Sequence, residues 1–343
     1  MRALLTSKPG QADLISYPEP VLSAPDEVIL RIERVGLCGS DQHHFQGDLG
    51  AAGELYPRIT GHEVSAVIEQ AGKAAGEGLT PGQRVAVLPV FACGGCYPCR
   101  AGRPNVCARL AVLGMHRDGA LADLMAVPAA NVVPVAPGVP PEAVAFMEPA
   151  AVAVHAVRRG RLAPGEHVVI FGAGPIGQAC CLAAAADGAA AMLVDPSGQR
   201  CEAATRTGAD AVYRGTSAQA LAAIADWCGG EAPEVIMDTT GDPAAFRDAV
   251  AAVIHGGRVV AVGLTGRQVC YSYGILAHHE LDVLGVSCCT ADDFRRAAGL
   301  VAGAVDRVMP LITDLITLAD VAAALPRIGG PGVMKIAVDL TAG

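Results

Sequence analysis

The stretch His167-Val168-Val169-Ile170-Phe171-Gly172-Ala173-Gly174-Pro175-Ile176-Gly177 decides the fold of this chain. Its first five residues are mostly apolar and β-branched, which predicts a buried strand. The glycines follow at once, and the Ala-rich run 178–186 after them predicts a helix. Strand, glycine turn and helix in this order are typical of a parallel sheet with crossover helices.

The turn between this strand and this helix has the spacing G-x-G-x-x-G. Its glycines permit a tight turn, the close approach of a pyrophosphate and tight packing of the helix, whose N-terminus adds free N–H groups and a positive dipole end. An unrelated glycine-rich turn is the alternative, but it does not explain the flanking strand and helix. We expect a dinucleotide to be bound at this turn, by Gly172, Gly174, Pro175, Ile176 and Gly177.

An acidic residue ends the next predicted strand, 191–194. Asp195 lies close to the expected distance of about 20 residues beyond the turn, and a carboxylate there accepts the ribose hydroxyls. It also repels a 2′-phosphate, which favours NAD over NADP, although Arg200 on the following helix softens that preference. Further apolar runs at 235–238, 258–262 and 281–285 extend the predicted sheet to about six strands.

Length and composition limit the kinds of protein this chain can be. Its 343 residues correspond to about two domains. With 25 basic and 34 acidic residues the formal net charge is −9, which argues against a nucleic acid or an anionic membrane as a partner. No apolar run approaches about 18 residues, and the first apolar stretch breaks too early for a signal peptide. We therefore expect a cytoplasmic protein.

Four of the twelve cysteines are clustered, at Cys93, Cys96, Cys99 and Cys107. Because the cytosol keeps thiols reduced, such a cluster indicates a metal more than disulfides. Four thiolates around Zn²⁺ form a closed tetrahedral site, which is structural. Two disulfides and an iron–sulfur cluster are the alternatives, and the spacing of the fourth cysteine does not fit a ferredoxin. We expect a structural zinc lobe at about 91–110.

A second set of candidate metal ligands is spread along the chain. Cys38 follows a predicted strand at 27–35, and His62 and Glu63 begin another β-rich stretch. A catalytic zinc needs three protein ligands and one open position, and Cys38, His62 and either Glu63 or Glu148 meet that count. Glu148 stands in an apolar stretch where an unpaired charge is costly, so it needs a cationic partner.

Together these motifs resemble those of the zinc-dependent medium-chain dehydrogenases, and within them the polyol (sorbitol-like) and threonine dehydrogenase branch. The resemblance covers essentially the whole chain. It is carried by Cys38-Gly39-Ser40-Asp41, Gly61-His62-Glu63, the four clustered cysteines, Glu148-Pro149 with Val152-Ala153-Val154-His155-Ala156, the glycine turn and Asp195. The resemblance implies a discontinuous, β-rich GroES-like catalytic domain made of 1–150 and 288–343. A Rossmann domain, a doubly wound parallel sheet, is implied between them at 151–287.

The resemblance also implies roles for single residues. Cys38, His62 and Glu63 correspond to zinc ligands, and Glu148 to a nearby carboxylate that binds the metal directly or through water. Ser40 and His43 resemble the proton-relay positions of the family. A solvated loop histidine is the alternative reading of His43, and His44 next to it could serve equally. Two zinc ions per chain and a homodimer or homotetramer are implied as well.

The expected reaction is oxidation of a secondary alcohol of a polyol, sugar or sugar acid to the ketone. Hydride passes to NAD, and the proton leaves through Ser40 and His43. A simple-alcohol or amino-alcohol (threonine-type) dehydrogenase with the same zinc centre is the alternative. A non-catalytic binding or structural protein of the same fold is a more remote one.

Overall fold

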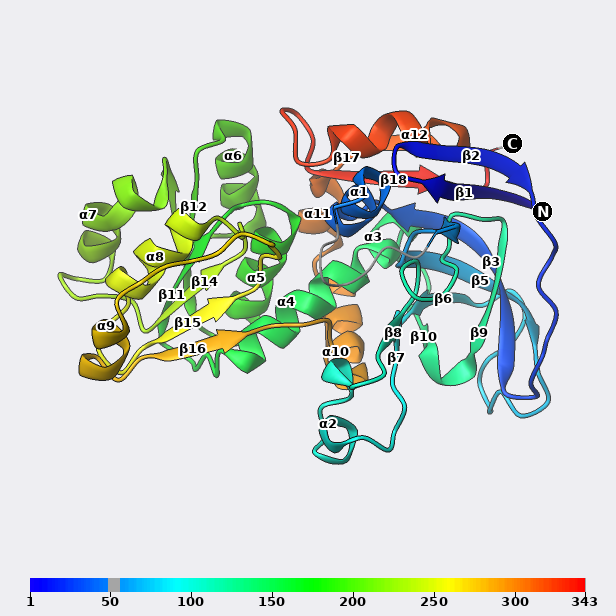
Figure 1. Ribbon diagram of the computed structural model, residues 1–343, viewed down its shortest axis with the longest axis horizontal. Coiled ribbons are helices and arrows are strands. Elements are labelled where there is room, and N and C mark those ends of the chain that lie inside the picture. The colour runs from blue at the N-terminus through cyan, green and yellow to red at the C-terminus, as the bar shows by residue number, and fades with distance from the viewer. Residues whose placement is uncertain (49–55, 343) are drawn as a thin grey trace. The chain divides into compact units, whose positions relative to one another are not determined.

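The computed structural model describes residues 1–48 and 56–342. Its contacts divide the chain into two compact units: unit 1, made of Met1–Glu148 and Cys289–Gly343, and unit 2, Pro149–Cys288. Unit 2 is therefore an insertion in the sequence of unit 1 (Figure 1). The predicted fold class, a parallel doubly wound sheet inserted in a discontinuous β-rich domain, is confirmed.

Unit 1 is built mainly from antiparallel strands. Its largest sheet has the order β10-β6-β5-β3-β18-β17, with β9 paired to β3. Smaller sheets join β2-β1-β4 and β7-β8. The strands are β1 (Arg2–Lys8), β2 (Gln11–Ser16), β3 (Glu27–Gly36), β4 (Arg58–Ile59), β5 (Glu63–Ala71), β6 (Arg84–Val87), β7 (Val90–Phe91), β8 (Ala111–Val112), β9 (Leu124–Pro128), β10 (Val132–Pro134), β17 (Ile312–Thr317) and β18 (Lys335–Asp339).

Short helices connect these strands and cover the core between them. Leu30 of β3, Ile68 of β5 and Val338 of β18 are at most 1% exposed and belong to one core cluster. The helices of unit 1 are α1 (Gly39–Gln46), α2 (Tyr97–Arg100), α3 (Pro141–Ala145), α10 (Ala291–Ala302), α11 (Val305–Val308) and α12 (Val321–Ala324). Single 3₁₀ turns lie at Pro104–Val106, Ala129–Asn131, Met309–Leu311, Leu318–Asp320 and Leu325–Arg327.

Unit 2 contains the parallel sheet that the glycine stretch predicts. Its six strands have the order β13-β12-β11-β14-β15-β16, and every neighbouring pair is parallel. The chain starts at a central strand, moves to one edge and returns to build the other, which is the order of a dinucleotide-binding fold. The strands are β11 (His167–Phe171), β12 (Ala190–Asp195), β13 (Ala211–Arg214), β14 (Val235–Asp238), β15 (Arg258–Ala261) and β16 (Asp282–Gly285).

Helices cover this sheet in pairs. α5 packs on β11 and β12, its neighbour α6 packs on β12 and β13, and α7 packs with α8 (Figure 1). Residues of α7 and α8 share a core with the strands, as Ile224 and Val250 show at 2% and 1% exposure. These helices are α4 (Met147–Arg159), α5 (Pro175–Ala186), α6 (Gly198–Thr207), α7 (Ser217–Trp227), α8 (Pro243–Ala252) and α9 (Tyr273–His278). Over the described residues, every helix is too short or too polar to cross a membrane.

Candidate metal centre and dinucleotide site

Three candidate ligands of unit 1 converge where β3 ends beside the start of β5. β3 runs antiparallel to β5, and this register sets Gly36 opposite Glu63. Cys38 follows β3 by two residues, and His62 immediately precedes β5. One ligand atom each of Cys38, His62 and Glu63 lies within 4.8 Å of the others. We call these three residues the mixed cluster.

The mixed cluster fits a zinc ion. His62 is 6% exposed and Glu63 is 1% exposed. Among the described residues, neither His62 Nδ1 nor Glu63 Oε2 has a hydrogen-bond partner, although both atoms are buried. Buried polar atoms without a partner are costly, and a bound cation would supply one. Bonds of 2.0–2.3 Å to zinc put tetrahedral donors about 3.3–3.8 Å apart, which the upper limit of 4.8 Å on the separations in the mixed cluster allows.

Lys335, the first residue of β18, belongs to the site although it was not predicted from the sequence. Its Nζ lies 2.7 Å from Glu63 Oε1 and donates to the carbonyl oxygen of Leu37 at 3.1 Å. Burial acts to lower the pKa of Lys335, but the charges of Glu63 and Cys38 outweigh it, and the pKa is raised. Lys335 therefore stays charged and fixes one carboxylate oxygen of Glu63. The other oxygen is left for a metal.

Asp41 belongs to the motif that begins at Cys38, but its supporting role was not predicted from the sequence. Its Oδ2 accepts from the backbone N–H of Cys38 at 2.9 Å, and its Oδ1 accepts from that of Gly61 at 3.1 Å. The same Oδ1 is 3.7 Å from His62 Nδ1. Burial acts to lower the pKa of His62, but Asp41 and Cys38 raise it well above its usual value. Asp41 thus holds both ligand-bearing segments together.

Gly36 makes room for the Glu63 carboxylate. A Cβ atom at position 36 would lie 2.0 Å from Glu63 Oε2. No side chain larger than a hydrogen therefore fits at position 36 while Glu63 keeps its place.

The other predicted residues of the reaction lie near these elements in unit 1. Glu148 is 8% exposed, and burial above all raises its pKa to about 7, with Glu63 adding to the rise and His62 opposing it. Within the described part of the chain, Glu148 does not join the mixed cluster. Ser40 and His43 lie on α1, and His43 Nδ1 is 2.8 Å from Asp48 Oδ1 with the imidazole 45% exposed. His44, the alternative, is 1% exposed.

The four predicted cysteines, Cys93, Cys96, Cys99 and Cys107, also come together. One sulfur atom of each lies within 4.8 Å of the others, and we call them the four-thiol cluster. Cys96 Sγ is 3.4 Å from Cys99 Sγ and 3.7 Å from Cys107 Sγ. Tetrahedral Zn–S bonds of about 2.3 Å put sulfur atoms about 3.8 Å apart, whereas a disulfide needs about 2.05 Å. These distances match a shared metal better than a disulfide.

Backbone and side-chain donors surround the four thiols. The amides of Cys93 and Arg109 each donate to Cys107 Sγ at 3.3 Å. The Arg109 side chain, which hydrogen-bonds the Cys93 thiol, is the main cause that lowers the pKa of Cys93 to about 5. Such donors favour thiolates, the form that binds zinc.

The glycine turn of unit 2 has the geometry that a dinucleotide needs. Gly172 has φ +93°, a conformation that other residues rarely adopt. At Gly174 an added Cβ meets nothing within 4 Å, which leaves open space beside the turn. At Gly177 an added Cβ would lie 1.9 Å from the carbonyl oxygen of Gly172, so α5 packs tightly on the turn. Tight turn, open approach and close packing are the three roles of these glycines in dinucleotide binding.

The rest of the predicted dinucleotide site lies at the same edge of the sheet. Pro175 and Ile176 open α5. Asp195 ends β12 and is 3% exposed. Arg200 Nη1 is 3.8 Å from Asp195 Oδ2. The carboxyl ends of parallel strands are where ligands bind in such sheets, so these residues are suitably placed.

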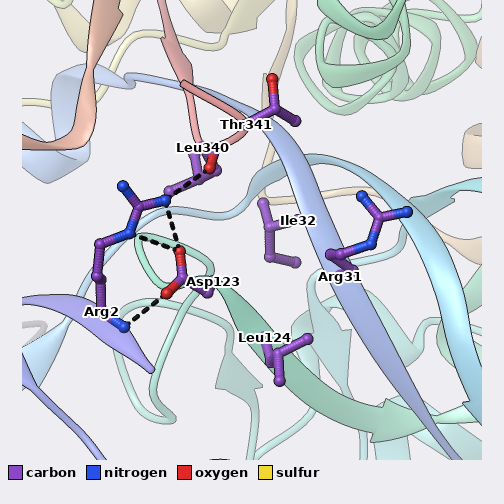
Figure 2. A pocket seen from close by; sticks show the side chains of 7 residues that line it. All are labelled: Arg2, Arg31, Ile32, Asp123, Leu124, Leu340 and Thr341. Carbon is purple, nitrogen blue, oxygen red and sulfur yellow. Dashed lines mark hydrogen bonds and ion pairs between the residues drawn. The ribbon is translucent and has the colours of Figure 1, made fainter. Parts of the chain in front are cut away.

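A separate cavity of about 400 Å³ lies elsewhere in unit 1 (Figure 2). Arg2 and Asp123 in its lining bind each other, and Arg2 also donates to the carbonyl oxygen of Leu340 (Figure 2). The lining holds no cysteine or histidine. This cavity is therefore not the candidate metal centre.

A parallel dinucleotide-type sheet, together with clusters of thiol, imidazole and carboxylate groups suited to zinc, defines a zinc-dependent oxidoreductase. Residues 24–137 match the model of the alcohol dehydrogenase GroES-like domain. Residues 175–303 match that of the zinc-binding dehydrogenases. The chain belongs to the zinc-dependent medium-chain alcohol dehydrogenases, as its motifs indicate.

Two curated relatives cover most of the chain. It is 36% identical to L-galactonate-5-dehydrogenase of Escherichia coli K12 over 304 residues, which are 88% of this chain and 87% of that protein. It is 32% identical to a D-xylulose reductase A, named as probable, of Neosartorya fischeri over 328 residues, 93% of this chain and 91% of the relative.

Two solved structures share the whole fold. The first is described as a short chain alcohol dehydrogenase, RspB, from Escherichia coli CFT073 in complex with NADH. Its TM-score is 0.89 at 28% identity, over 99% of both chains. The second, from Sinorhizobium meliloti 1021, is described as a zinc-binding dehydrogenase bound to NADP. Its TM-score is 0.89 at 27% identity, also over 99% of both chains.

Proposed function

We propose that this protein oxidises a secondary alcohol of a polyol, sugar or sugar acid to the ketone, using zinc and transferring hydride to NAD. The observation that carries the proposal is the mixed cluster, in which a thiol, an imidazole and a carboxylate come within 4.8 Å of one another. Three protein ligands with one position left open are the ligand set of a catalytic zinc. The relatives named for a sugar acid and for xylulose support the substrate class.

Each residue near the mixed cluster has a proposed task. Cys38, His62 and Glu63 would hold a zinc ion, which would lower the pKa of a substrate hydroxyl. Lys335 holds Glu63, and Asp41 holds the backbone at Cys38 and Gly61. Glu148 is a second, buried carboxylate beside these ligands.

Ser40 and His43 are proposed to move the proton away. They lie three residues apart on α1 and so share one face of that helix. Because the His43 imidazole is 45% exposed and contacts Asp48, a proton that reaches it can pass to water.

The proposed cofactor is NAD, because the carboxylate of Asp195 ends β12 where it would accept the ribose hydroxyls. We also propose two zinc ions per chain, one in each cluster. A cytoplasmic homodimer or homotetramer without nucleic-acid or membrane partners completes the proposal. β16 supports self-association, because it lies at the end of the strand order and its Val283 is 37% exposed.

The test is a reduction assay with NAD and a substrate panel of sorbitol, xylitol, a sugar acid, ethanol and threonine, run beside zinc analysis. Turnover of a polyol or sugar acid by the two-zinc protein is expected. Preference for ethanol or threonine would instead establish the simple-alcohol or amino-alcohol alternative. A zinc-loaded protein that binds NAD but oxidises none of the panel would contradict the proposal.

A further inference from the structure

The corner of unit 2 where β12 ends holds two arginines beside Asp195. Arg214 is the last residue of β13 and is paired in register with Asp195. Arg200 lies on α6, with its Nη1 3.8 Å from Asp195 Oδ2. Arg214 reaches over the start of the same helix, because a Cβ at Gly198 would lie 3.2 Å from Arg214 Cζ. Two guanidinium groups therefore accompany one carboxylate.

The Asp195 carboxylate is held by backbone donors. Its Oδ2 accepts from the N–H of Ala173 at 2.8 Å, and its Oδ1 accepts from the N–H of Ser197 at 2.8 Å. These bonds fix Asp195 against the glycine turn and spread its negative charge. Each oxygen keeps a lone pair that can still accept a ribose hydroxyl.

Arg214 is exposed, and within the described residues its guanidinium has no carboxylate partner. The thiol of Cys201 links the ends of β12 and β13, because its one hydrogen is shared between the carbonyl oxygens of Asp195 at 3.2 Å and Tyr213 at 3.8 Å. Burial raises the pKa of Cys201, the Asp195 charge adds to that rise and the Arg214 charge opposes it. The Asp195 carboxylate and the Arg214 guanidinium therefore both lie near the Cys201 thiol.

An arginine beside the ribose site is the usual recognition element for a 2′-phosphate, because its planar donors match the phosphate oxygens. We propose that Arg214, assisted by Arg200, binds the 2′-phosphate of NADP, so that the enzyme accepts NADP as well as NAD and Arg214 sets the ratio between them. The inference rests on the proposed function, since it requires a dinucleotide on the glycine turn. The two positive charges offset the repulsion that Asp195 exerts on the phosphate.

The test is calorimetric titration of the zinc-loaded protein and its Arg214→Ala variant with NAD, NADP, 5′-AMP and 2′,5′-ADP. Charge-assisted hydrogen bonds are strong, so Arg214→Ala should lower the affinity for NADP and for 2′,5′-ADP by about 10- to 100-fold. Binding of NAD and 5′-AMP should change by less than about twofold, because neither carries the 2′-phosphate. The nucleotide fragments test the ribose corner independently of catalysis.

Arg206→Ala is the matched control. Arg206 lies on the last turn of α6 and is exposed like Arg214, so its replacement removes the same charge at a distance from the corner. It should leave the ratio of NADP to NAD affinity unchanged. Circular dichroism and thermal melting would verify that both variants fold.

Three results would overturn the proposal. The first is an equal loss of affinity for NAD and NADP in Arg214→Ala, and the second is an unchanged affinity of that variant for NADP. The third is a loss of NADP affinity in Arg206→Ala as large as that in Arg214→Ala. In each case NAD reduction by the wild-type protein would leave the proposed function standing. A wild-type protein that binds neither dinucleotide would instead contradict the proposed function.

Discussion

The four-thiol cluster and the mixed cluster are both suited to zinc, but they are built in opposite ways. The four thiols lie within 15 residues of sequence, from Cys93 to Cys107, and three of them are partly exposed. The mixed cluster joins segments around residues 38 and 62, and Lys335, which holds it, is 272 residues from Glu63. A local loop can be completed by its metal, whereas a buried open site needs support from the surrounding sheet.

This difference predicts that loss of a mixed-cluster ligand has the largest effect on turnover. Cys38→Ala should lower kcat at least about 10³-fold, because metal-ion catalysis supplies several kcal/mol of transition-state stabilisation. Zinc content should fall from two ions to one, while calorimetry shows unchanged NAD affinity. Cys270→Ala is the control, since Cys270 is an exposed thiol outside both clusters. Full activity of Cys38→Ala with one zinc missing would show that the mixed cluster does not take part in catalysis.

The next largest effect is expected from replacing Lys335, which supports the mixed cluster, and it is an effect on the free energy of unfolding. Lys335→Met leaves the Glu63 carboxylate charged and buried, and breaking a buried ion pair costs about 3–5 kcal/mol. Urea unfolding of the chelator-treated protein measures this loss. The double variant Lys335→Met/Glu63→Gln should recover part of it, because the unpaired charge is gone. A loss below about 1 kcal/mol in the single variant would mean that Lys335 does not support the cluster.

A smaller loss of stability is expected from Gly36→Ala. The added methyl would lie 2.0 Å from Glu63 Oε2, and such overpacking costs about 1–3 kcal/mol. Zinc affinity of the mixed cluster should weaken as the carboxylate shifts. Gly39→Ala is the matched control, because an added Cβ there meets nothing within 4 Å. Equal effects of the two substitutions on zinc affinity would contradict the close-approach argument.

The smallest effect on turnover is expected from the four-thiol cluster. Cys99→Ser should remove one zinc ion and open the lobe to limited proteolysis. It should lower kcat by less than about tenfold, because a closed four-thiolate site has no position for substrate. Metal analysis, peptide mapping of the cleavage sites and the reduction assay check these outcomes together. A loss of turnover as large as that of Cys38→Ala would contradict the assignment of a purely structural role to the four-thiol cluster.

The parts of the molecule that depend on local sequence were predictable. The strand at His167–Phe171, the glycine turn and the helix after it stand where the pattern predicts them. The four-thiol cluster follows from spacing alone, since its cysteines share one short loop. Periodicity and spacing suffice wherever the interacting residues are close in the chain.

The support of the mixed cluster was not predictable in the same way, because it depends on strand register between distant segments. Lys335 had a signal, since it is a lone charge in the apolar run Val333-Met334-Lys335-Ile336-Ala337-Val338. Such a residue needs a buried partner, but the pattern does not say which acid it meets. Asp41 also had a signal in the sequence, because an acid three residues after Cys38 suits the first turn of a helix.

The register of β18 beside β3 has a consequence for biosynthesis. Glu63 and Lys335 meet only after the 140 residues of Pro149–Cys288 have been synthesised between them. Until β18 has been synthesised, Glu63 therefore lacks this cationic partner. The Glu63–Lys335 ion pair is thus among the last contacts of the large sheet that synthesis of the chain makes possible.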